Sequence, residues 1–292
     1  MSNRSKSEIL NKLGYDYGIT SDSFKIIQEK IYIDNLDRDY VFWQVSDTHI
    51  NYVEDESLID FYGQKNRDWT PKKDGFNPLY AFDFMIEEAK KRGLDALILA
   101  GDLVDFCNQT SIDYVCDRLK TLDCEKIVAL GNHEGSLGDP VITTRTFYPK
   151  YMELTSQKPD CRIVDYGKFM FATLDDSDLK IVPEQIEFLK SLKKYNKPVI
   201  LVTHIPLITE GLEPSCMKIW GTKFMLGTYD DTDLTKEAVS IIKAEDSPII
   251  AVLAGHLHYE NTSEFKKGQY QYCSAPLFTR FIREIIITSK KG

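Results

Sequence analysis

All five histidines of this 292-residue chain lie just beyond the end of a short apolar segment. Carboxylates and one amide stand beside them, so the candidate residues are Asp47, His49, Asp102, Asp105, Asn132, His133, His204, His256 and His258. A lone histidine near an apolar segment is more often a structural residue than a ligand, but that explanation would have to hold five times here. Imidazole and carboxylate without cysteine favour Mn, Fe, Co, Ni or Zn over Mg or Ca. We therefore expect these residues to form one metal site.

The spacing of two segments suits a pair of ions. Asp47 and His49 stand at positions i and i+2, which point to the same side of an extended segment, so both can bind one ion. His256 and His258 share a face in the same way, and each can serve a different ion if the two metals lie about 4 Å apart. The spacing therefore favours a two-metal centre.

The segments that must position these residues alternate between two kinds. Short apolar runs are typical of strands buried on both faces, and they lie at 40–45, 96–100, 126–130, 198–203 and 249–254. Apolar residues at helical spacing occur at 78–92, 111–122 and 183–195. This alternation predicts an α/β fold, in which polar groups beyond the carboxyl ends of neighbouring strands meet in one crevice. Gly101 and Gly131 permit sharp turns at two of these strand ends.

We expect one main domain with an N-terminal extension. Residues 1–38 are predicted to form that extension, with a short helix near 7–13 and an edge strand in FKIIQEKIYI, and residues 39–292 to form a single domain. The C-terminal segment predicts two further strands that complete a sheet. Arg280 and Arg283 in this segment are expected to be exposed rather than catalytic.

Two stretches without clear periodicity, 51–77 and 209–233, are long enough to favour a functional explanation. The first contains aromatic residues among cations, namely Tyr52, Phe61, Tyr62, Lys65, Arg67, Trp69, Lys72 and Lys73. This mixture suits a nucleobase with its phosphate, and a solvated loop held down by surface aromatics is the alternative. The second, which is either a lid or a loop that covers the core, contains Lys218, Trp220, Lys223, Phe224 and Met225.

Composition excludes several classes of protein. The formal net charge of −9 argues against a broad basic surface for duplex nucleic acid. No apolar run is long enough to cross a membrane, and the polar start lacks the apolar core of a secretory signal, so we expect a cytoplasmic protein without a membrane partner. Six scattered cysteines without a CxxC pair are expected to be reduced thiols.

In chain order the candidate segments read D-x-H, G-D-x-x-D, G-N-H-E, H and G-H-x-H. This ordered set resembles the signature of the calcineurin-like metallophosphoesterase superfamily, over roughly residues 41–259. The resemblance implies a four-layer α/β/β/α sandwich, with two central β-sheets packed face to face, helices outside, and metals at the carboxyl edge of the sheets.

The resemblance also implies roles for the candidate residues. It assigns two sets of ligands that share Asp102 as a bridge, the first being Asp47, His49, Asp102 and His258, and the second Asp102, Asn132, His204 and His256. His133 is then the histidine that binds no metal, and Asp105 matches the carboxylate that pairs with it. Such a carboxylate would raise the pKa of the imidazole, fix its tautomer and leave it able to donate a proton.

Two adjacent ions lower the pKa of a bridging water and stabilise both the attacking and the leaving oxygen at phosphorus. We therefore expect a phosphate ester to be hydrolysed by a metal-bridging hydroxide, with His133 as the acid and with Mn or Fe favoured among the metals.

The protein serine/threonine phosphatases of the superfamily carry arginines where Phe106 and Leu130 stand here. The pattern is therefore closer to class III cyclic-nucleotide phosphodiesterases and glycerophosphodiesterases, although their third segment ends more often in Asp than in Glu134. We expect a small phosphorylated substrate, with nucleotides among the candidates and a phosphodiester favoured. A phosphomonoesterase for small molecules or nucleotides, and a non-catalytic scaffold of the same fold, are the alternatives.

Overall fold

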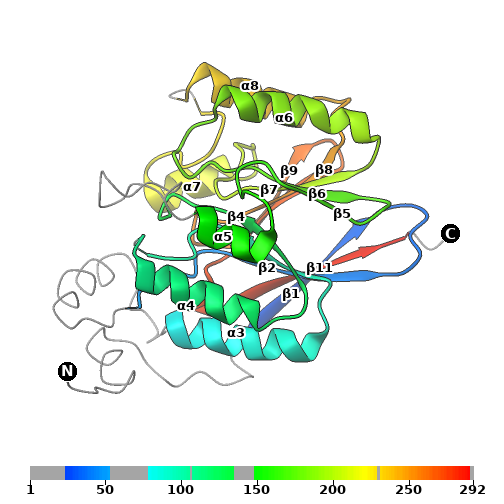
Figure 1. The fold of residues 1–292 in the computed structure, drawn as a ribbon. Coiled ribbons are helices and arrows are strands. Elements are labelled where there is room, and N and C mark those ends of the chain that lie inside the picture. Colours follow the sequence, from blue (N-terminus) through cyan, green and yellow to red (C-terminus); the bar gives the residue numbers. More distant parts are fainter. Residues whose placement is uncertain (1–23, 53–77, 106, 135–147, 229–230, 290–292) are drawn as a thin grey trace, which may run out of the picture.

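Two mixed β-sheets packed face to face form the centre of the molecule, with helices on their outer sides (Figure 1). The computed structural model describes residues 24–52, 78–105, 107–134, 148–228 and 231–289. These ranges contain both sheets and all the candidate metal ligands. The helix expected near 7–13, residue 106 and most of the 51–77 stretch lie outside the described residues.

The first sheet has the strand order β1-β11-β2-β3-β4. Strands β2, β3 and β4 are parallel, β11 runs antiparallel to β2, and β1 pairs in parallel with β11 along its whole length. Helices α3, α4 and α5 lie on this side of the molecule (Figure 1). The elements are β1 (Lys25–Tyr32), β2 (Tyr40–Val45), β3 (Ala96–Ala100), β4 (Glu125–Ala129), β11 (Phe281–Thr288), α3 (Pro78–Arg92), α4 (Gln109–Lys120) and α5 (Tyr148–Thr155).

The second sheet has the order β5-β6-β7-β8-β10-β9. Its four central strands are parallel, and β5 and β9 are antiparallel at the two edges. The elements are β5 (Ile163–Asp165), β6 (Met170–Thr173), β7 (Val199–Val202), β8 (Ile249–Ala254), β9 (Asn261–Lys266), β10 (Gln269–Cys273), α6 (Pro183–Ser191), α7 (Glu213–Trp220) and α8 (Asp233–Lys243), with 3₁₀ turns at Leu192–Tyr195 and Leu277–Thr279.

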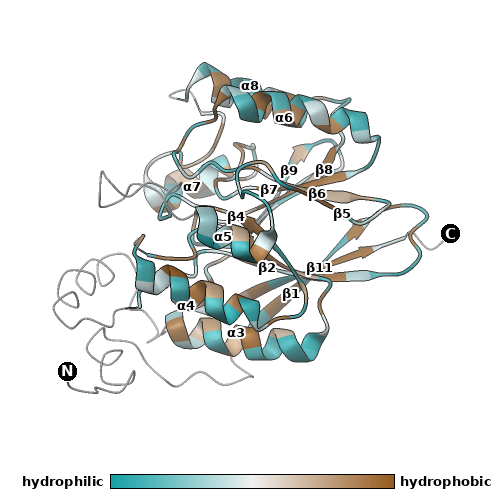
Figure 2. Ribbon diagram, in the orientation of Figure 1, coloured by the Kyte–Doolittle hydropathy of each residue, from teal (hydrophilic) through white to brown (hydrophobic). Residues whose placement is uncertain are grey.

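Three apolar clusters fill the spaces between the layers. The central cluster packs the two sheets together and contains a group of stacked and edge-to-face aromatic rings, formed by Tyr40, Phe42, Tyr166, Phe169 and Phe171. A second cluster joins the first sheet to α3 and α4, and a third joins the second sheet to α6 and α8. Figure 2 shows the matching pattern, with largely hydrophobic strands and helices that carry both kinds of residue. The four-layer α/β/β/α prediction is confirmed.

Most predicted elements form where the sequence pattern placed them. The five apolar runs are strands, and α3 spans the predicted range Pro78–Arg92. Helix α4 begins earlier than expected because Asn108 caps it, accepting a hydrogen bond from the Ser111 backbone N–H at 2.9 Å.

The 209–233 stretch is not irregular throughout, because it contains α7. Only Cys216 of this eight-residue helix is buried, so no apolar stripe marks it in the sequence. Its end is set instead by Gly221, which adopts a left-handed φ of 71°.

The expectation that Arg283 is exposed is wrong. Its side chain is fully buried, pairs with Glu29 at 2.8 Å and donates a hydrogen bond to the Cys273 carbonyl at 3.0 Å. A strand from the other sheet therefore supplies a partner that the linear sequence does not reveal.

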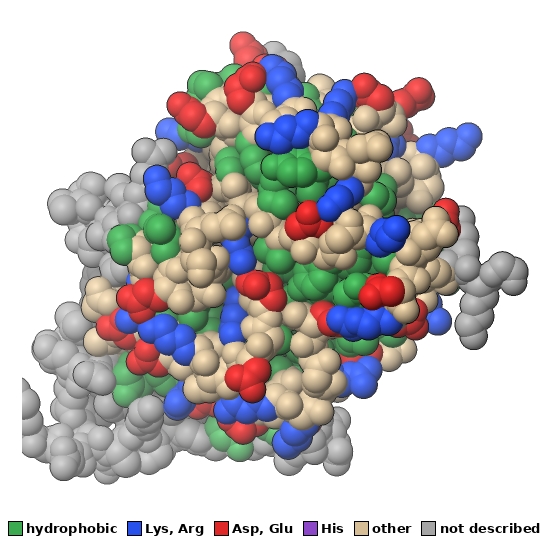
Figure 3. All heavy atoms as spheres, turned by 45° about the vertical axis from the view of Figure 1, so that its right-hand side comes forward, with side chains coloured by type: hydrophobic (Ala, Val, Ile, Leu, Met, Phe, Trp, Pro, Cys, Tyr) green, Lys and Arg blue, Asp and Glu red, His purple; other side chains and the backbone are tan. Residues whose placement is uncertain are grey.

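The face drawn in Figure 3 mixes charges, and the described residues contain no membrane-spanning helix. On the face drawn in Figure 3, basic and acidic side chains are interspersed. Among the described residues, no helix combines the length and apolar character needed to cross a membrane. All six cysteines are free thiols.

Arg283→Ala should lower the free energy of unfolding by about 3 kcal/mol, because removing one partner of a buried pair leaves the other polar groups without a hydrogen-bond partner. The matched variant Arg38→Ala breaks the pair with Asp95, in which the arginine side chain is 54% exposed, and should cost at most about 1 kcal/mol. Denaturant unfolding of both variants measures the difference. Equal losses would contradict a structural role for the buried arginine.

Candidate metal centre

The carboxyl ends of five strands, three from the first sheet and two from the second, bring all nine candidate residues together. Asp47 and His49 follow β2, Asp102 and Asp105 follow β3, and Asn132 and His133 follow β4. From the second sheet, His204 follows β7, and the His256 and His258 pair follows β8. The convergence of polar side chains predicted from the strand ends is therefore present.

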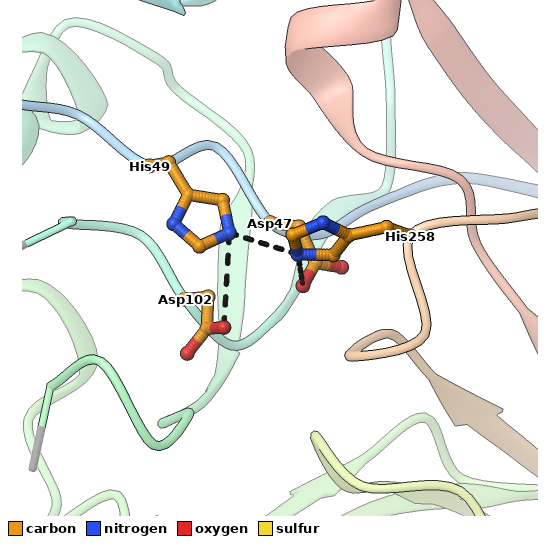
Figure 4. A group of neighbouring side chains, drawn as sticks. All are labelled: Asp47, His49, Asp102 and His258. Carbon is orange, nitrogen blue, oxygen red and sulfur yellow. Dashed lines mark hydrogen bonds and ion pairs between the residues drawn. The ribbon is translucent and has the colours of Figure 1, made fainter. Parts of the chain in front are cut away.

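The first donor cluster contains Asp47, His49, Asp102 and His258. Figure 4 shows the four side chains pointing toward a common centre from three different loops. The Nε2 atoms of His49 and His258 lie 3.0 Å apart, His258 Nε2 is 3.3 Å from Asp47 Oδ1, and His49 Nε2 is 3.8 Å from Asp102 Oδ2. Two imidazole nitrogens and two carboxylates this close together are typical donors for a transition-metal ion.

The second donor cluster contains Asp102, His204 and His256, with Asn132 beside them. His204 Nε2 lies 3.1 Å from Asp102 Oδ2, 3.2 Å from Asn132 Oδ1 and 3.2 Å from His256 Nδ1. Asp102 belongs to both clusters, so the two groups of donors share one carboxylate.

The backbone that presents these side chains is not extended. Asp47, His49, Asp102, His256 and His258 all have left-handed φ values, between 47° and 69°. The two i, i+2 pairs do converge, but the expected reason, an extended segment, is wrong. Non-glycine residues adopt this conformation rarely and at a cost, and such positions gather at functional sites.

Two histidines have their Nδ1 atoms fixed by backbone carbonyls. His204 Nδ1 lies 2.8 Å from the Ala100 oxygen and His133 Nδ1 lies 2.9 Å from the Asp105 oxygen. Because a carbonyl only accepts, each Nδ1 must carry the proton and donate it. The Nε2 atoms of both rings then face the Asp102 carboxylate.

The Asp105 carboxylate lies closer to His49 than to its expected partner His133. Its Oδ1 is 3.2 Å from His49 Nδ1 but 3.6 Å from His133 Nδ1. A carboxylate beside Nδ1 keeps the ring proton on Nδ1. The Nε2 atom of His49 is then the one that can bind a metal ion in the cluster. Asp105 thus contacts both histidines, one through its side chain and the other mainly through its carbonyl.

The charges of the site favour cations. Burial opposes ionisation of Asp102, but the neighbouring His204 and His133 outweigh it and hold the pKa of this carboxyl well below its usual range. Burial also disfavours the charged form of His204, yet the Asp102 carboxylate raises its pKa to about 10. Burial and the charge of His204 lower the pKa of His256 to about 3. Without a metal ion, a proton on His204 therefore balances Asp102, and a metal ion would displace that proton.

Two buried carboxylates that hold the ligand loops were missed by sequence reasoning. Glu134 accepts hydrogen bonds from the backbone N–H groups of Asp102 at 3.0 Å, Val104 at 2.9 Å and Gly131 at 2.6 Å. Burial and the Asp102 charge raise the pKa of Glu134 to about 7. The glutamate at the last position of the G-N-H-E segment was a signal for this role.

Asp176 does the same for the loop after β7. It accepts a hydrogen bond from the Thr203 hydroxyl at 2.6 Å and from the Ile205 N–H at 2.8 Å, and the His204 N–H lies 3.3 Å from its other oxygen. Burial raises the pKa of this carboxyl to about 7. The strand β6 that precedes it was not among the predicted elements, although the apolar run FMFATL at 169–174, directly before two aspartates, was a signal for it.

Residues 40–260 match the family described as calcineurin-like phosphoesterase. The chain therefore belongs to this family, which confirms the resemblance found in the sequence, and it is a hydrolase acting on phosphate esters. The donors of the two clusters fit the pair of metal ions that membership implies.

One curated relative, a probable cyclic nucleotide phosphodiesterase of Coxiella burnetii, is 25% identical over 203 residues, covering 68% of this chain and 75% of the relative. The crystal structure of a dimetal phosphatase from Danio rerio has a TM-score of 0.57 at 13% identity, covering 82% of this chain and 88% of that one. The phosphopantetheinyl hydrolase of Mycobacterium tuberculosis has a TM-score of 0.47 at 13% identity, covering 82% and 91%. The Danio rerio likeness supports the fold.

Gly101→Ala should lower metal affinity by about tenfold or more, because the added methyl group would overlap the His204 imidazole. Gly167→Ala is a matched control, since its φ of 80° is close to the 84° of Gly101 but its methyl group would meet open space. The control should cost only the backbone strain of about 1–2 kcal/mol. Isothermal titration with Mn²⁺ and denaturant unfolding separate the two effects. Unchanged Mn²⁺ binding in the Gly101 variant would contradict the close packing described here.

Proposed function

We propose that the protein is a metal-dependent phosphodiesterase for a small phosphorylated molecule. The observation that carries this proposal is the pair of donor clusters that share Asp102, with His133 beside them. His133 belongs to neither cluster, although it forms a third group of neighbouring side chains with His49 and Asp105. In this proposal one ion is held by Asp47, His49, Asp102 and His258, and the other by Asp102, Asn132, His204 and His256. When bound, two such ions supply Lewis-acid stabilisation of phosphoryl oxygens and activate water.

His133 is the proposed general acid. Its Nδ1 proton is donated to the Asp105 carbonyl, so Nε2, 3.9 Å from Asp102 Oδ2, is the atom that faces the site. Burial disfavours the charged imidazole, but the Asp102 and Asp105 carboxylates outweigh burial and raise its pKa. His133 can therefore hold a proton on Nε2 and deliver it to the leaving oxygen of the ester.

Two observations favour a diester over a monoester. Leu130 is fully buried where the protein phosphatases carry an arginine, so this position offers no cation for the second charge of a monoester. The Coxiella burnetii relative is named as a probable phosphodiesterase. Mixed imidazole and carboxylate donors suit Mn, Fe, Co, Ni or Zn, and we propose Mn or Fe among them. The complete donor set argues against a scaffold that has lost its metals, and a nucleotide or small-molecule phosphomonoesterase is the second candidate.

Hydrolysis of bis-p-nitrophenyl phosphate should exceed that of p-nitrophenyl phosphate when the purified protein is loaded with Mn²⁺. Elemental analysis in parallel should give about two metal ions per chain. A strong preference for the monoester would contradict the phosphodiesterase proposal and favour a phosphatase. Absence of both metal and activity after reconstitution would overturn the proposed function altogether.

His133→Ala should lower kcat by about 10²–10⁴-fold while both metal ions remain bound, because the residue supplies a proton and no metal donor. His49→Ala is the contrasting variant, since it removes a donor of the first cluster and should lose metal as well as turnover. Metal content and kcat are measured on the same samples. Loss of metal from the His133 variant would contradict its role as an acid.

A further inference from the structure

Two aromatic rings contributed by α7 and the loop after it stand against the His256 and His258 imidazoles. The Trp220 ring centroid is 5.9 Å from that of His258, with an interplanar angle of 79°. The Phe224 ring is 5.7 Å from that of His256 at 80°, and the two aromatic rings lie 5.9 Å from each other. They form an aromatic wall, defined here as Trp220 and Phe224, beside both donor clusters.

The wall is exposed, although its residues are large and apolar. Trp220 is 37% exposed and Phe224 is 44% exposed. Trp220 and Phe224 have the largest apolar side chains of the segment. If the segment only covered the core, these two side chains would be the first to be buried. The core contacts are made instead by Leu212, Cys216 and Met225, which belong to a small apolar cluster together with Leu257.

The wall is also held in place. Trp220 Nε1–H donates a hydrogen bond to the Leu257 carbonyl at 3.0 Å, between the two histidines of the pair after β8. Gly221 ends α7 with a left-handed φ of 71°, so the chain turns sharply and returns Phe224 to the side of Trp220. A rigid aromatic surface loses little conformational entropy when a ligand packs on it.

We propose that Trp220 and Phe224 bind a planar aromatic group attached to the substrate phosphate, of the nucleobase class. This inference rests on the proposed function, because it assumes that the phosphate lies at the donor clusters. A phosphate beside His256 and His258 places its substituent within reach of the rings that touch these imidazoles. Aromatic rings bind bases through their π-faces. The net charge of −9 favours a mononucleotide or dinucleotide over a longer chain of phosphates.

Binding of adenosine 5′-monophosphate and of ribose 5-phosphate to the Mn²⁺-loaded protein tests the wall, since the two probes share sugar and phosphate and differ in the base. Isothermal titration should show about tenfold tighter binding of the nucleotide by the unaltered protein. Trp220→Ala should reduce this ratio to near one, and Phe224→Ala should reduce it as well. Free phosphate is assayed after each titration so that hydrolysis is not counted as binding.

Two further variants separate stacking from a loss of structure. Trp220→Phe keeps a ring and should retain most of the preference for the nucleotide. Met217→Ala removes a 41% exposed apolar side chain from the same helix and should leave the ratio unchanged. Equal binding of the two probes by the unaltered protein, or a ratio that survives Trp220→Ala, would overturn the proposal.

The outcome is distinguishable from that of the proposed function. Diester hydrolysis without a nucleotide preference would contradict the base-binding role of the aromatic wall and leave the phosphodiesterase proposal in place. The opposite result is a nucleotide preference that depends on Trp220 in a protein that hydrolyses neither p-nitrophenyl ester. It would support the base-binding role of the aromatic wall and contradict the phosphodiesterase proposal.

Discussion

The buried carboxylate of Asp102 is the group around which the rest of the centre is arranged. It is 1% exposed, its Oδ1 accepts a hydrogen bond from the His133 backbone N–H at 2.9 Å, and Nε2 atoms of three histidines lie within 3.9 Å of Oδ2. A buried negative charge is costly unless cations or hydrogen-bond donors compensate for it. The surrounding imidazoles supply part of this compensation, since the Asp102 carboxylate raises the pKa of His204 to about 10, and metal ions would supply more. The same charge therefore explains why histidines gather here and why a bound cation would be favourable.

The left-handed backbone of the ligand loops needs support from outside the ligands. Glu134 collects three backbone N–H groups from the loops after β3 and β4, and Asp176 binds backbone and hydroxyl groups of the loop after β7. Unsatisfied buried N–H groups would cost about 1–3 kcal/mol each. These two carboxylates thus accept hydrogen bonds from backbone N–H groups that have no partner in a helix or sheet. They hold the ligand loops in place without belonging to either donor cluster.

The sequence predicted five core strands and the nine polar residues because each leaves a local mark, whereas the four layers were implied by the family resemblance. Fully buried strands read as short apolar runs, and α3 shows helical spacing from Pro78 to its last residue. What the sequence did not predict depends on contacts between distant segments. The burial of Arg283, the position of the Asp105 carboxylate beside His49 and the left-handed φ of Asp47 all arise from pairing across loops or sheets. Helix α7 was not predicted because nearly all of it is exposed, so its sequence shows no periodic spacing of apolar residues.

The site lies across the junction of the two sheets, so their packing fixes its geometry. Gln44 on β2 and Arg283 on β11 are paired in register, and both donate to carbonyls of β10 in the second sheet, Gln44 to Tyr272 at 3.0 Å and Arg283 to Cys273 at 3.0 Å. Beyond these strand ends, Asp47 from the first sheet accepts a hydrogen bond from the His256 N–H of the second at 3.1 Å. A sliding of one sheet over the other would break all three contacts and separate the donors of the first cluster, since His258 lies on the opposite sheet from Asp47 and His49. The aromatic core between the sheets is therefore part of the machinery that positions the ligands, although none of its residues lies in the site.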